Sequence, residues 1–253
     1  MKRILLTNDD GVRSPGLYEL ARAVARLGEV TIVAPHLEAS AIGHALTLRR
    51  PLRVEQIDAN VYEVDGTPTD CVNVAFTRIL PDPPDIILSG INKGYNLGDD
   101  VTYSGTVAGA MEGALLGIRS IAVSLERTAG TYDFRHAAAT AAQVAERLLA
   151  GPALPPRTFI NINVPAGKPK GIRITVQARR NHITVVDQRV DPRGQPYYWI
   201  EEGQNDWEPH DRSDYQAVRD GFVSVTPLQP DLTDYNSLAM LDELSTWREV
   251  EVE

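Results

Sequence analysis

Residues 3–34 have the sequence RILLTNDDGVRSPGLYELARAVARLGEVTIVA, and this stretch decides the fold class of the chain. Residues 3–8 form a short apolar run and residues 29–34 a β-branched run, so each is expected to be a buried strand. The segment between them, residues 15–27, carries apolar side chains at helical spacing: Leu17, Leu20, Ala21, Val24 and Leu27. A strand, a helix and a second strand in this order predict a parallel βαβ unit with a right-handed crossover.

The alternation of strands and helices continues to about residue 165. Further elements are expected along the chain: strands at residues 85–89, 120–125 and 158–163, and helices at residues 69–80, 106–117 and 133–150. Thr69 is the expected N-cap of the first of these helices. Residues 45–57 and 61–65 alternate apolar and polar side chains, which predicts a hairpin off the main sheet. We therefore expect an α/β fold, with a Rossmann-like, doubly wound, mostly parallel sheet in a catalytic core over residues 1–165.

The sequence changes in character after residue 165, and residues 166–253 are expected to form a strand-rich C-terminal extension of hairpin and helix. Three stretches read as strands, and DPRG at residues 191–194 is a turn signal between the last two: residues 171–177, 183–190 and 195–201. Aromatic side chains are concentrated in this extension. Two interpretations stay open: a lid or hairpin packed on the same core, or a projecting arm whose aromatic side chains are buried against a second subunit.

Composition narrows the class of protein. The chain has 253 residues, of which 43% are hydrophobic and 23% charged, as in a soluble globular protein. No apolar run approaches the roughly 20 residues that cross a bilayer, and the start, MKRILLTNDDG, does not resemble a signal peptide. Cys71 is the single cysteine, so an internal disulfide and a cysteine-based metal cluster are excluded. We expect a cytoplasmic enzyme without a membrane partner.

Charge is unevenly distributed along the chain. Residues 1–186 hold 20 Lys and Arg and 18 Asp and Glu, whereas residues 187–253 hold 5 and 16. A protein that binds a nucleic-acid polymer needs a basic face, which this distribution argues against. A small anionic substrate remains compatible, because a local site can reverse the average field.

Adjacent carboxylates follow the first predicted strand. In open α/β sheets, ligands bind beyond the carboxyl ends of the strands, and Asp9 and Asp10 lie at such an end. Two neighbouring like charges are usually held together by a cation, and hard oxygen ligands suit Mg²⁺, Mn²⁺ or Ca²⁺. The alternative is a simple turn, because Asn-Asp-Asp-Gly is also good turn composition.

Two further loops follow strand ends. The loop at residues 36–44 supplies the hydroxyl of Ser40 and two histidines, His36 and His44, each more often a satisfied loop residue than a catalyst. The loop at residues 89–100 is rich in glycine, so its backbone N–H groups can approach an anion closely. In that loop, Asn92 and Asn96 offer amide donors and oxygen ligands. Lys93 could offset phosphate charge, but it is more readily expected to face solvent.

A helix is predicted to open at Ser104, Gly105 and Thr106. A helix N-terminus with free N–H groups and hydroxyls is an anion site, although a plain N-cap is the alternative. Gly109 and Gly113 each lower helix propensity by up to about 1 kcal/mol, so close packing on the sheet is expected to require them. Carboxylates, amides, a hydroxyl and an anion site at one sheet edge predict metal-assisted phosphoryl transfer or phosphate-ester hydrolysis.

Several motifs closely resemble the survival-protein E (SurE) family of metal-dependent nucleotidases. They are TNDDG at residues 7–11, PHLEAS at 35–40, GTPTDCV at 66–72, SGINKGYNLGDDVTYSGTVAGAMEG at 89–113 and INVP at 162–165. The resemblance implies a Rossmann-like core and a C-terminal segment used in oligomerisation, so a homodimer or tetramer is expected. It also implies hydrolysis of nucleoside 5′- or 3′-monophosphates, with short polyphosphate as a substrate of some members. Lys93 takes no role from it.

The resemblance further implies one divalent ion per subunit, Mg²⁺, Mn²⁺ or Ca²⁺, held at Asp9, Asp10, Ser40 and Asn92. Our hypothesis for the mechanism adds Asn96 and the helix start at Ser104, Gly105 and Thr106 as phosphate-binding groups. Asp10 is the more suitable carboxylate to orient or deprotonate the attacking water. A covalent aspartyl-phosphate ranks lower, because the acids are adjacent and a D-x-D signature is absent.

Three alternative functions stay open at this point. A sugar-nucleotide glycosyltransferase would need a second nucleotide-binding half, for which residues 165–253 look too short and strand-rich. A metal-dependent deacetylase would need histidine ligands beside Asp9 and Asp10, and none flanks them. A non-catalytic nucleotide or phosphate sensor would bind without releasing phosphate.

Overall fold

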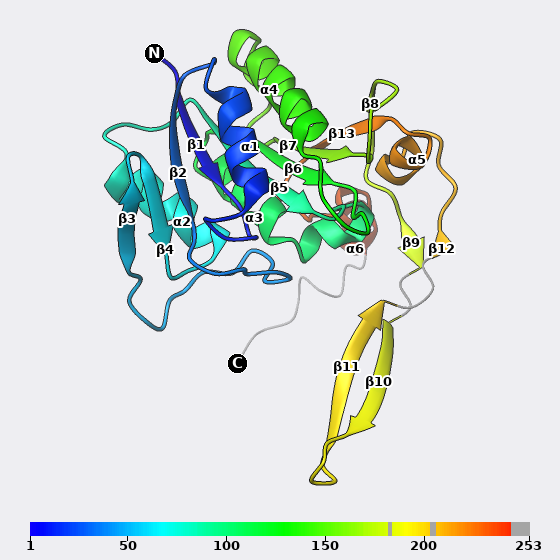
Figure 1. The fold of residues 1–253 in the computed structure, drawn as a ribbon. Helices are drawn as coiled ribbons and strands as arrows, with labels where there is room; N and C mark the ends of the chain where they lie inside the picture. The colour runs from blue at the N-terminus through cyan, green and yellow to red at the C-terminus, as the bar shows by residue number, and fades with distance from the viewer. Residues whose placement is uncertain (182–183, 203–205, 244–253) are drawn as a thin grey trace, which may run out of the picture.

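The computed structural model describes residues 1–181, 184–202 and 206–243, and these residues are arranged around one large sheet (Figure 1). Its strands are β1 (Arg3–Thr7), β2 (Glu29–Pro35), β3 (Val54–Asp58), β4 (Val61–Val64), β5 (Ile86–Lys93), β6 (Arg119–Leu125), β7 (Phe159–Val164), β8 (Ile172–Ile174) and β13 (Val223–Leu228). Their order across the sheet is β3-β4-β2-β1-β5-β6-β7-β13-β8. The run from β4 to β7 is parallel throughout, which confirms the expected α/β class with a mostly parallel sheet.

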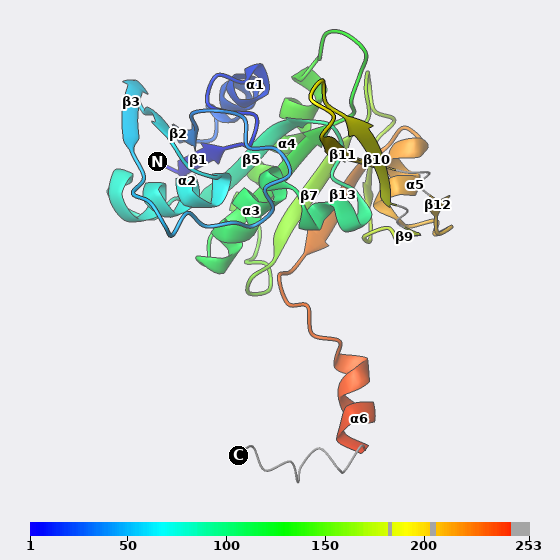
Figure 2. The same cartoon turned by 90° about the horizontal axis from the view of Figure 1, so that it is seen from below.

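Helices cover both faces of the sheet (Figure 2). One face carries α1 (Pro15–Val24) and α4 (Arg135–Ala150), and the other carries α2 (Pro68–Val74) and α3 (Gly105–Leu115). Alternation along each strand explains the two layers, since successive side chains point to opposite faces. In β1, Ile4 and Leu6 pack with α1 and α4, whereas Leu5 packs with α2. Both faces of the central strands are thus buried, which is why they are continuous apolar runs in the sequence.

Two details of the sequence prediction are wrong. The strands β3 and β4 do form a hairpin, but β4 pairs parallel with β2, so the hairpin extends the main sheet instead of lying off it. The N-cap of α2 is Thr67, not Thr69, because the Thr67 side chain accepts a bond from Asp70 N and Asp70 accepts one from Thr67 N. This capping box satisfies two helix-end donors at once, an arrangement that Thr69 does not have.

The glycines of α3 pack directly on the sheet, as expected. A Cβ at Gly109 would lie 2.8 Å from Ser89 Oγ, and one at Gly113 would lie 2.3 Å from Ser120 Oγ. Both distances are too short for a side chain, so these positions require glycine for close approach. The contact brings the first turn of α3 down to the carboxyl end of β1.

The C-terminal extension contributes two strands to the main sheet and then projects from it. The strand β13 pairs antiparallel with β7 and parallel with β8. A separate hairpin of β10 (Thr184–Val190) and β11 (Pro196–Glu202) points away from the body (Figure 1), with Trp199 56% and Ile200 79% exposed. The helix α6 (Tyr235–Glu243) also lies away from the sheet (Figure 2). The hairpin therefore projects from the core and does not pack on it as a lid.

Three short elements flank the hairpin in the chain: β9 (Arg180–Asn181), β12 (Asp206–Trp207) and α5 (Asp214–Arg219), of which α5 packs on β13 and β7. The strands β9 and β12 pair with each other and lie beside the body of the protein (Figure 1). Across the described ranges of the chain, no helix combines the length and the apolar character needed to cross a bilayer.

Candidate active site

The predicted site lies where the order of the strands switches from one side of β1 to the other. The strand β1 pairs on one side with β2 and on the other with β5, so the connections diverge between β1 and β5. Asp9 and Asp10 follow β1 directly, and Asn92 lies near the end of β5. Ligands of open α/β sheets bind in the crevice at such a switch point.

A cavity of about 760 Å³ opens at this edge. It brings together six residues predicted from the sequence: Asp9, Asp10, Ser40, Asn92, Asn96 and Ser104. They come from four separate segments of chain: the ends of β1 and β5, the loop after β2 and the start of α3. Gly105 and Thr106 lie behind Asp9, outside the lining of the cavity.

Asp9 is held by groups from two neighbouring elements. Its side chain accepts a hydrogen bond from the Thr106 hydroxyl, and a Cβ at Gly105 would lie only 2.9 Å from Asp9 Cβ. Its backbone oxygen accepts a bond of 2.8 Å from Ala39 N, which ties the Ser40 loop to the end of β1. Burial raises the pKa of Asp9, and the bond from Thr106 opposes that rise. Asp9 is therefore a desolvated carboxylate in a fixed orientation.

Asp10 is the more open of the two acids and lies close to a cation. Burial raises its pKa to about 6, against the opposing charge of Lys93. Lys93 Nζ lies 3.8 Å from Asp10 Oδ1, and Asp10 Oδ2 is buried without a hydrogen-bond partner among the described residues. A buried carboxylate oxygen without a partner is costly. The free oxygen of Asp10 is therefore available to bind a cation beside Asp9.

Ser40 and Asn92 present oxygen atoms beside the acids. Ser40 Oγ donates a 2.6 Å hydrogen bond to Glu38 Oε1, so its lone pairs remain available. Asn92 Nδ2 donates to Gly94 O at 3.0 Å, which leaves Asn92 Oδ1 as the group with ligand capacity. Two carboxylates, a hydroxyl and an amide oxygen form a hard donor set that fits Mg²⁺, Mn²⁺ or Ca²⁺.

The donor set contains few of the residues by which metal sites are usually recognised. No group of three or more His, Cys, Asp or Glu side chains able to hold a metal is present in the part of the chain that the structure describes. The proposed set has only two such residues, and its other members are Ser40 and Asn92. A site of this composition would leave open coordination positions for substrate oxygens.

The cavity lining also contains Asn96 and Ser104, the residues predicted to bind phosphate. Ser104 is the N-cap of α3, and its Oγ accepts a 3.1 Å bond from Val107 N, which leaves the hydroxyl hydrogen for another acceptor. Asn96 is buried, and its Nδ2 donates to Ser124 Oγ at 2.7 Å. Its backbone oxygen accepts bonds from the side-chain amides of Asn161 and Asn163. This network fixes Asn96 at the cavity wall, opposite a helix N-terminus suited to phosphate.

The histidines of the loop after β2 lie outside the cavity lining. His36 Nδ1 contacts Glu63 Oε1 at 2.9 Å, and His44 Nε2 contacts Glu112 Oε2 at 2.7 Å. Asn73 Nδ2 donates to the second oxygen of Glu112, on α3. Both histidines are therefore satisfied loop residues, and His44 joins the Ser40 loop to the helix that carries Ser104.

Several lining residues receive no role from the sequence alone. Lys93 has a side chain that is 36% exposed, and its Nζ lies 3.8 Å from Asp10 Oδ1. Glu38, two residues before Ser40 in the PHLEAS motif, accepts a hydrogen bond from the Ser40 hydroxyl. Arg180 and Ile200 reach the cavity from the C-terminal extension, and only their three-dimensional placement reveals them.

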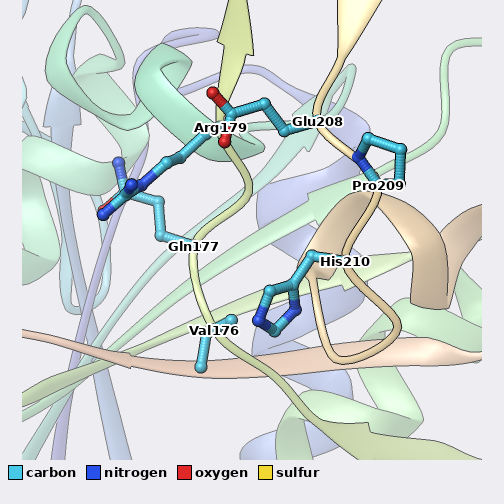
Figure 3. Close-up of a pocket in the computed structure, with 6 residues that line it drawn as sticks. All are labelled: Val176, Gln177, Arg179, Glu208, Pro209 and His210. Atoms are coloured by element: carbon cyan, nitrogen blue, oxygen red, sulfur yellow. The ribbon is translucent and has the colours of Figure 1, made fainter.

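A second cavity, of about 410 Å³, lies against the C-terminal extension (Figure 3). Its lining comes from the segments before β9 and after β12: Val176, Gln177, Arg179, Glu208, Pro209 and His210. It contains none of the residues predicted for the site and lacks paired carboxylates. The chemistry indicated by the sequence therefore belongs to the cavity at the end of β1.

Comparison with known proteins agrees with this geometry. A sequence profile of the family described as Survival protein SurE matches residues 4–184. The chain belongs to the SurE family. Among its SurE relatives, the protein named 5′-nucleotidase SurE from Syntrophotalea carbinolica is 49% identical, and the match covers 96% of this chain and 97% of that protein. The 5′-nucleotidase SurE of Geotalea daltonii is 52% identical over 94% and 97%.

A solved SurE structure has the same fold. The crystal structure of the SurE protein from Aquifex aeolicus superposes with a TM-score of 0.85 at 43% sequence identity. The match covers 96% of this chain and 99% of that one. The likeness thus extends through the C-terminal extension as well as the parallel sheet.

Proposed function

We propose that this SurE-family protein is a metal-dependent phosphatase that hydrolyses nucleoside 5′-monophosphates, and 3′-monophosphates, to nucleoside and inorganic phosphate. The observation that carries the proposal is the pairing of Asp9 and Asp10 with an anion-binding helix start in one cavity. Short polyphosphate is a further proposed substrate, since it offers the same terminal phosphate group. Relatives named 5′-nucleotidase SurE, similar over nearly the whole chain, support the reaction class.

The proposed cofactor is one divalent cation per subunit, Mg²⁺ or Mn²⁺, with Ca²⁺ as a third candidate. Asp9, Asp10, Ser40 and Asn92 would hold it through oxygen atoms. When bound there, it would polarise the phosphoryl group and offset the charge that develops in the transition state.

The protein side chains have separate roles in the proposed reaction. Asn96 and the Ser104 hydroxyl, at the N-terminus of α3, bind the phosphoryl oxygens as charge accumulates on them. Thr106 holds Asp9 in one orientation through its hydroxyl group. Thr106 can fill this role without contacting the substrate. Asp10 orients the attacking water and accepts its proton as the ester bond breaks, while the nucleoside leaves with a proton from solvent.

Phosphate release measured with malachite green tests the proposal. Nucleoside 5′- and 3′-monophosphates are incubated with the full chain in EDTA and then with excess Mg²⁺, Mn²⁺, Ca²⁺ or Zn²⁺. We expect no release in EDTA and turnover on adding Mg²⁺ or Mn²⁺. Nucleotide binding without phosphate release with any of these metals would support the sensor alternative.

We further propose that the chain assembles into a homodimer or tetramer through its C-terminal extension and works in the cytoplasm. The hairpin of β10 and β11 exposes apolar and aromatic side chains along its length, which single subunits in water do not favour: Val186, Val190, Tyr198, Trp199 and Ile200. Such side chains are the usual anchors of protein interfaces.

A further inference from the structure

A short turn connects the two proposed phosphate-binding residues. Asn96 precedes it, Ser104 follows it, and between them lies a 3₁₀ helix, η2 (Gly98–Thr102). The backbone oxygen of Tyr103, at the end of the turn, also accepts a 2.9 Å bond from Gly43 N of the loop that carries Ser40. The position of this turn therefore sets the spacing between Asn96 and Ser104.

The C-terminal extension holds this turn from the outside. Asp214 is fully buried and accepts three backbone bonds: 3.1 Å from Gly98 N, 3.0 Å from Ala178 N and 2.7 Å from Tyr215 N. Gln177 Nε2 donates to Gly98 O at 3.0 Å. The N–H and the carbonyl group of Gly98 are thus both hydrogen-bonded to residues more than 75 positions later in the chain.

Arg180 makes the charged part of the same contact. Its side chain is 2% exposed and pairs with the carboxylate of Asp100, in the middle of the turn. The guanidinium group lies 5.3 Å from the ring centre of Trp207, and that ring stacks on Tyr215 at 4.3 Å. Arg180 is therefore fixed by an ion pair on one side and an aromatic stack on the other.

We propose that Arg180 is a positioning residue for phosphate-ester hydrolysis, which holds Asp100 and so keeps Asn96 and Ser104 at the spacing that the phosphoryl group requires. The inference rests on the proposed function, because it takes Asn96 and Ser104 as the phosphate-binding groups. It assigns the C-terminal extension a part in the active site besides assembly. Arg180 and Asp100 both line the catalytic cavity, so their displacement changes its wall directly.

The neighbouring Arg179 provides a matched control. It has the same side chain one position earlier in the chain, but it is exposed and lines the separate cavity of Figure 3. Gln177, which donates a hydrogen bond to Gly98 O, is unchanged in both variants. A general effect of losing a cation near this sheet edge would appear in both variants, whereas a positioning effect would appear only at Arg180.

The experiment compares Arg180→Met and Arg179→Met in the full chain, with steady-state kinetics on a nucleoside 5′-monophosphate. Because a misplacement of about 1 Å costs roughly 100-fold, we expect Arg180→Met to lower kcat/KM by about 100-fold. Competitive inhibition by inorganic phosphate should weaken in parallel, while the Kd for Mn²⁺ measured by calorimetry stays the same. We expect Arg179→Met to stay within about twofold of the parent protein.

Three further measurements guard against a variant that does not fold. Asp100→Asn keeps the shape of the turn and removes the charge that Arg180 holds, and it should reproduce the kinetic defect. The double variant should lose no more than the worse single variant, because both changes break one contact. Added guanidinium ion should restore part of the activity of Arg180→Met and none of that of Asp100→Asn.

Equal activity of the two arginine variants, alongside an inactive Asp9→Asn enzyme, would overturn the inference and leave the proposed site standing. A loss in Arg180→Met without any weakening of phosphate inhibition would also overturn it. If Asp9→Asn turned over at the parent rate, the assignment of Asp9 as a metal ligand would fail. If the parent chain released no phosphate with any of the metals, the proposed function would fail, and both results are separate from the comparison of the two arginine variants.

Discussion

Replacing Asp9 with Asn is expected to lower kcat/KM for nucleoside monophosphates by about 1,000-fold or more, the scale of losing a main electrostatic group of an active site. The variant removes a charged ligand from the proposed cation site but keeps an oxygen that accepts the hydrogen bond from Thr106. Phosphate release in saturating Mn²⁺ gives the rate. The increase of Tm on adding Mn²⁺ should shrink in the variant, because the ion loses one of its two carboxylates.

The same substitution should make the metal-free protein more stable at neutral pH. Burial raises the pKa of Asp9 above that of the unfolded chain, so its ionised form destabilises the folded state. Asparagine has nearly the same shape and carries no charge, which removes this cost. In EDTA, the Tm of Asp9→Asn should therefore exceed that of the parent protein.

Asp82→Asn is the matched control for both measurements. Asp82 pairs with Arg3 and has a side chain 61% exposed. Its change to Asn should leave the turnover rate and the Mn²⁺-induced rise in Tm unaltered. A fully active Asp9→Asn enzyme, or one whose Tm falls in EDTA, would contradict the assignment of Asp9 as a buried metal ligand.

The parallel sheet could be predicted because its information is local. The apolar runs that became β1, β2 and β5 to β7 are buried on both faces, and such runs have few alternatives in an α/β protein. The location of Asp9, Asp10 and Asn92 at one edge followed from the same topology, since parallel strands bring their carboxyl ends together.

The features that escaped prediction depend on partners distant in the chain. Nothing near residues 61–64 states that β4 will pair with β2. Arg180 reaches Asp100 across 80 positions, and His44 reaches Glu112 across 68. The N-cap of α2 was a local error of another kind, because Thr67 and Thr69 are both good caps and only Thr67 has Asp70 three residues later.

Affinity for Mn²⁺ is expected to fall steeply as the pH is lowered below about 6. Burial raises the pKa of Asp10 to about 6, and it raises the pKa of Asp9 as well. Below its own pKa, each acid binds a proton that the metal must displace. The Kd should therefore rise by about tenfold per pH unit for each carboxylate that loses a proton. Calorimetry in two buffers of different ionisation enthalpy measures both the Kd and the number of protons released.

The pKa shift of Asp10 also determines whether the stability of the metal-free protein rises or falls with pH. An acid whose pKa is raised by folding binds more protons in the folded state, so its contribution to stability falls as the pH rises from the unfolded value through about 6. Bound metal reverses this trend by stabilising the ionised form. The increase of Tm on adding Mn²⁺ should thus grow between about pH 5 and pH 7.5.

Asp10→Asn separates this effect from the titration of other groups. Carboxylates such as Asp85, whose pKa is lowered by Lys2 and by the N–H of Arg3, change stability in the opposite direction in both proteins. Their contribution cancels when the variant is compared with the parent protein at each pH. The variant should release fewer protons on binding Mn²⁺ and should show a flatter dependence of Kd on pH. Equal proton release by the two proteins would mean that Asp10 does not ligate the ion. Another charged residue of the cavity lining would then have to replace it as a ligand. Glu38, which accepts a hydrogen bond from Ser40, would be the first candidate.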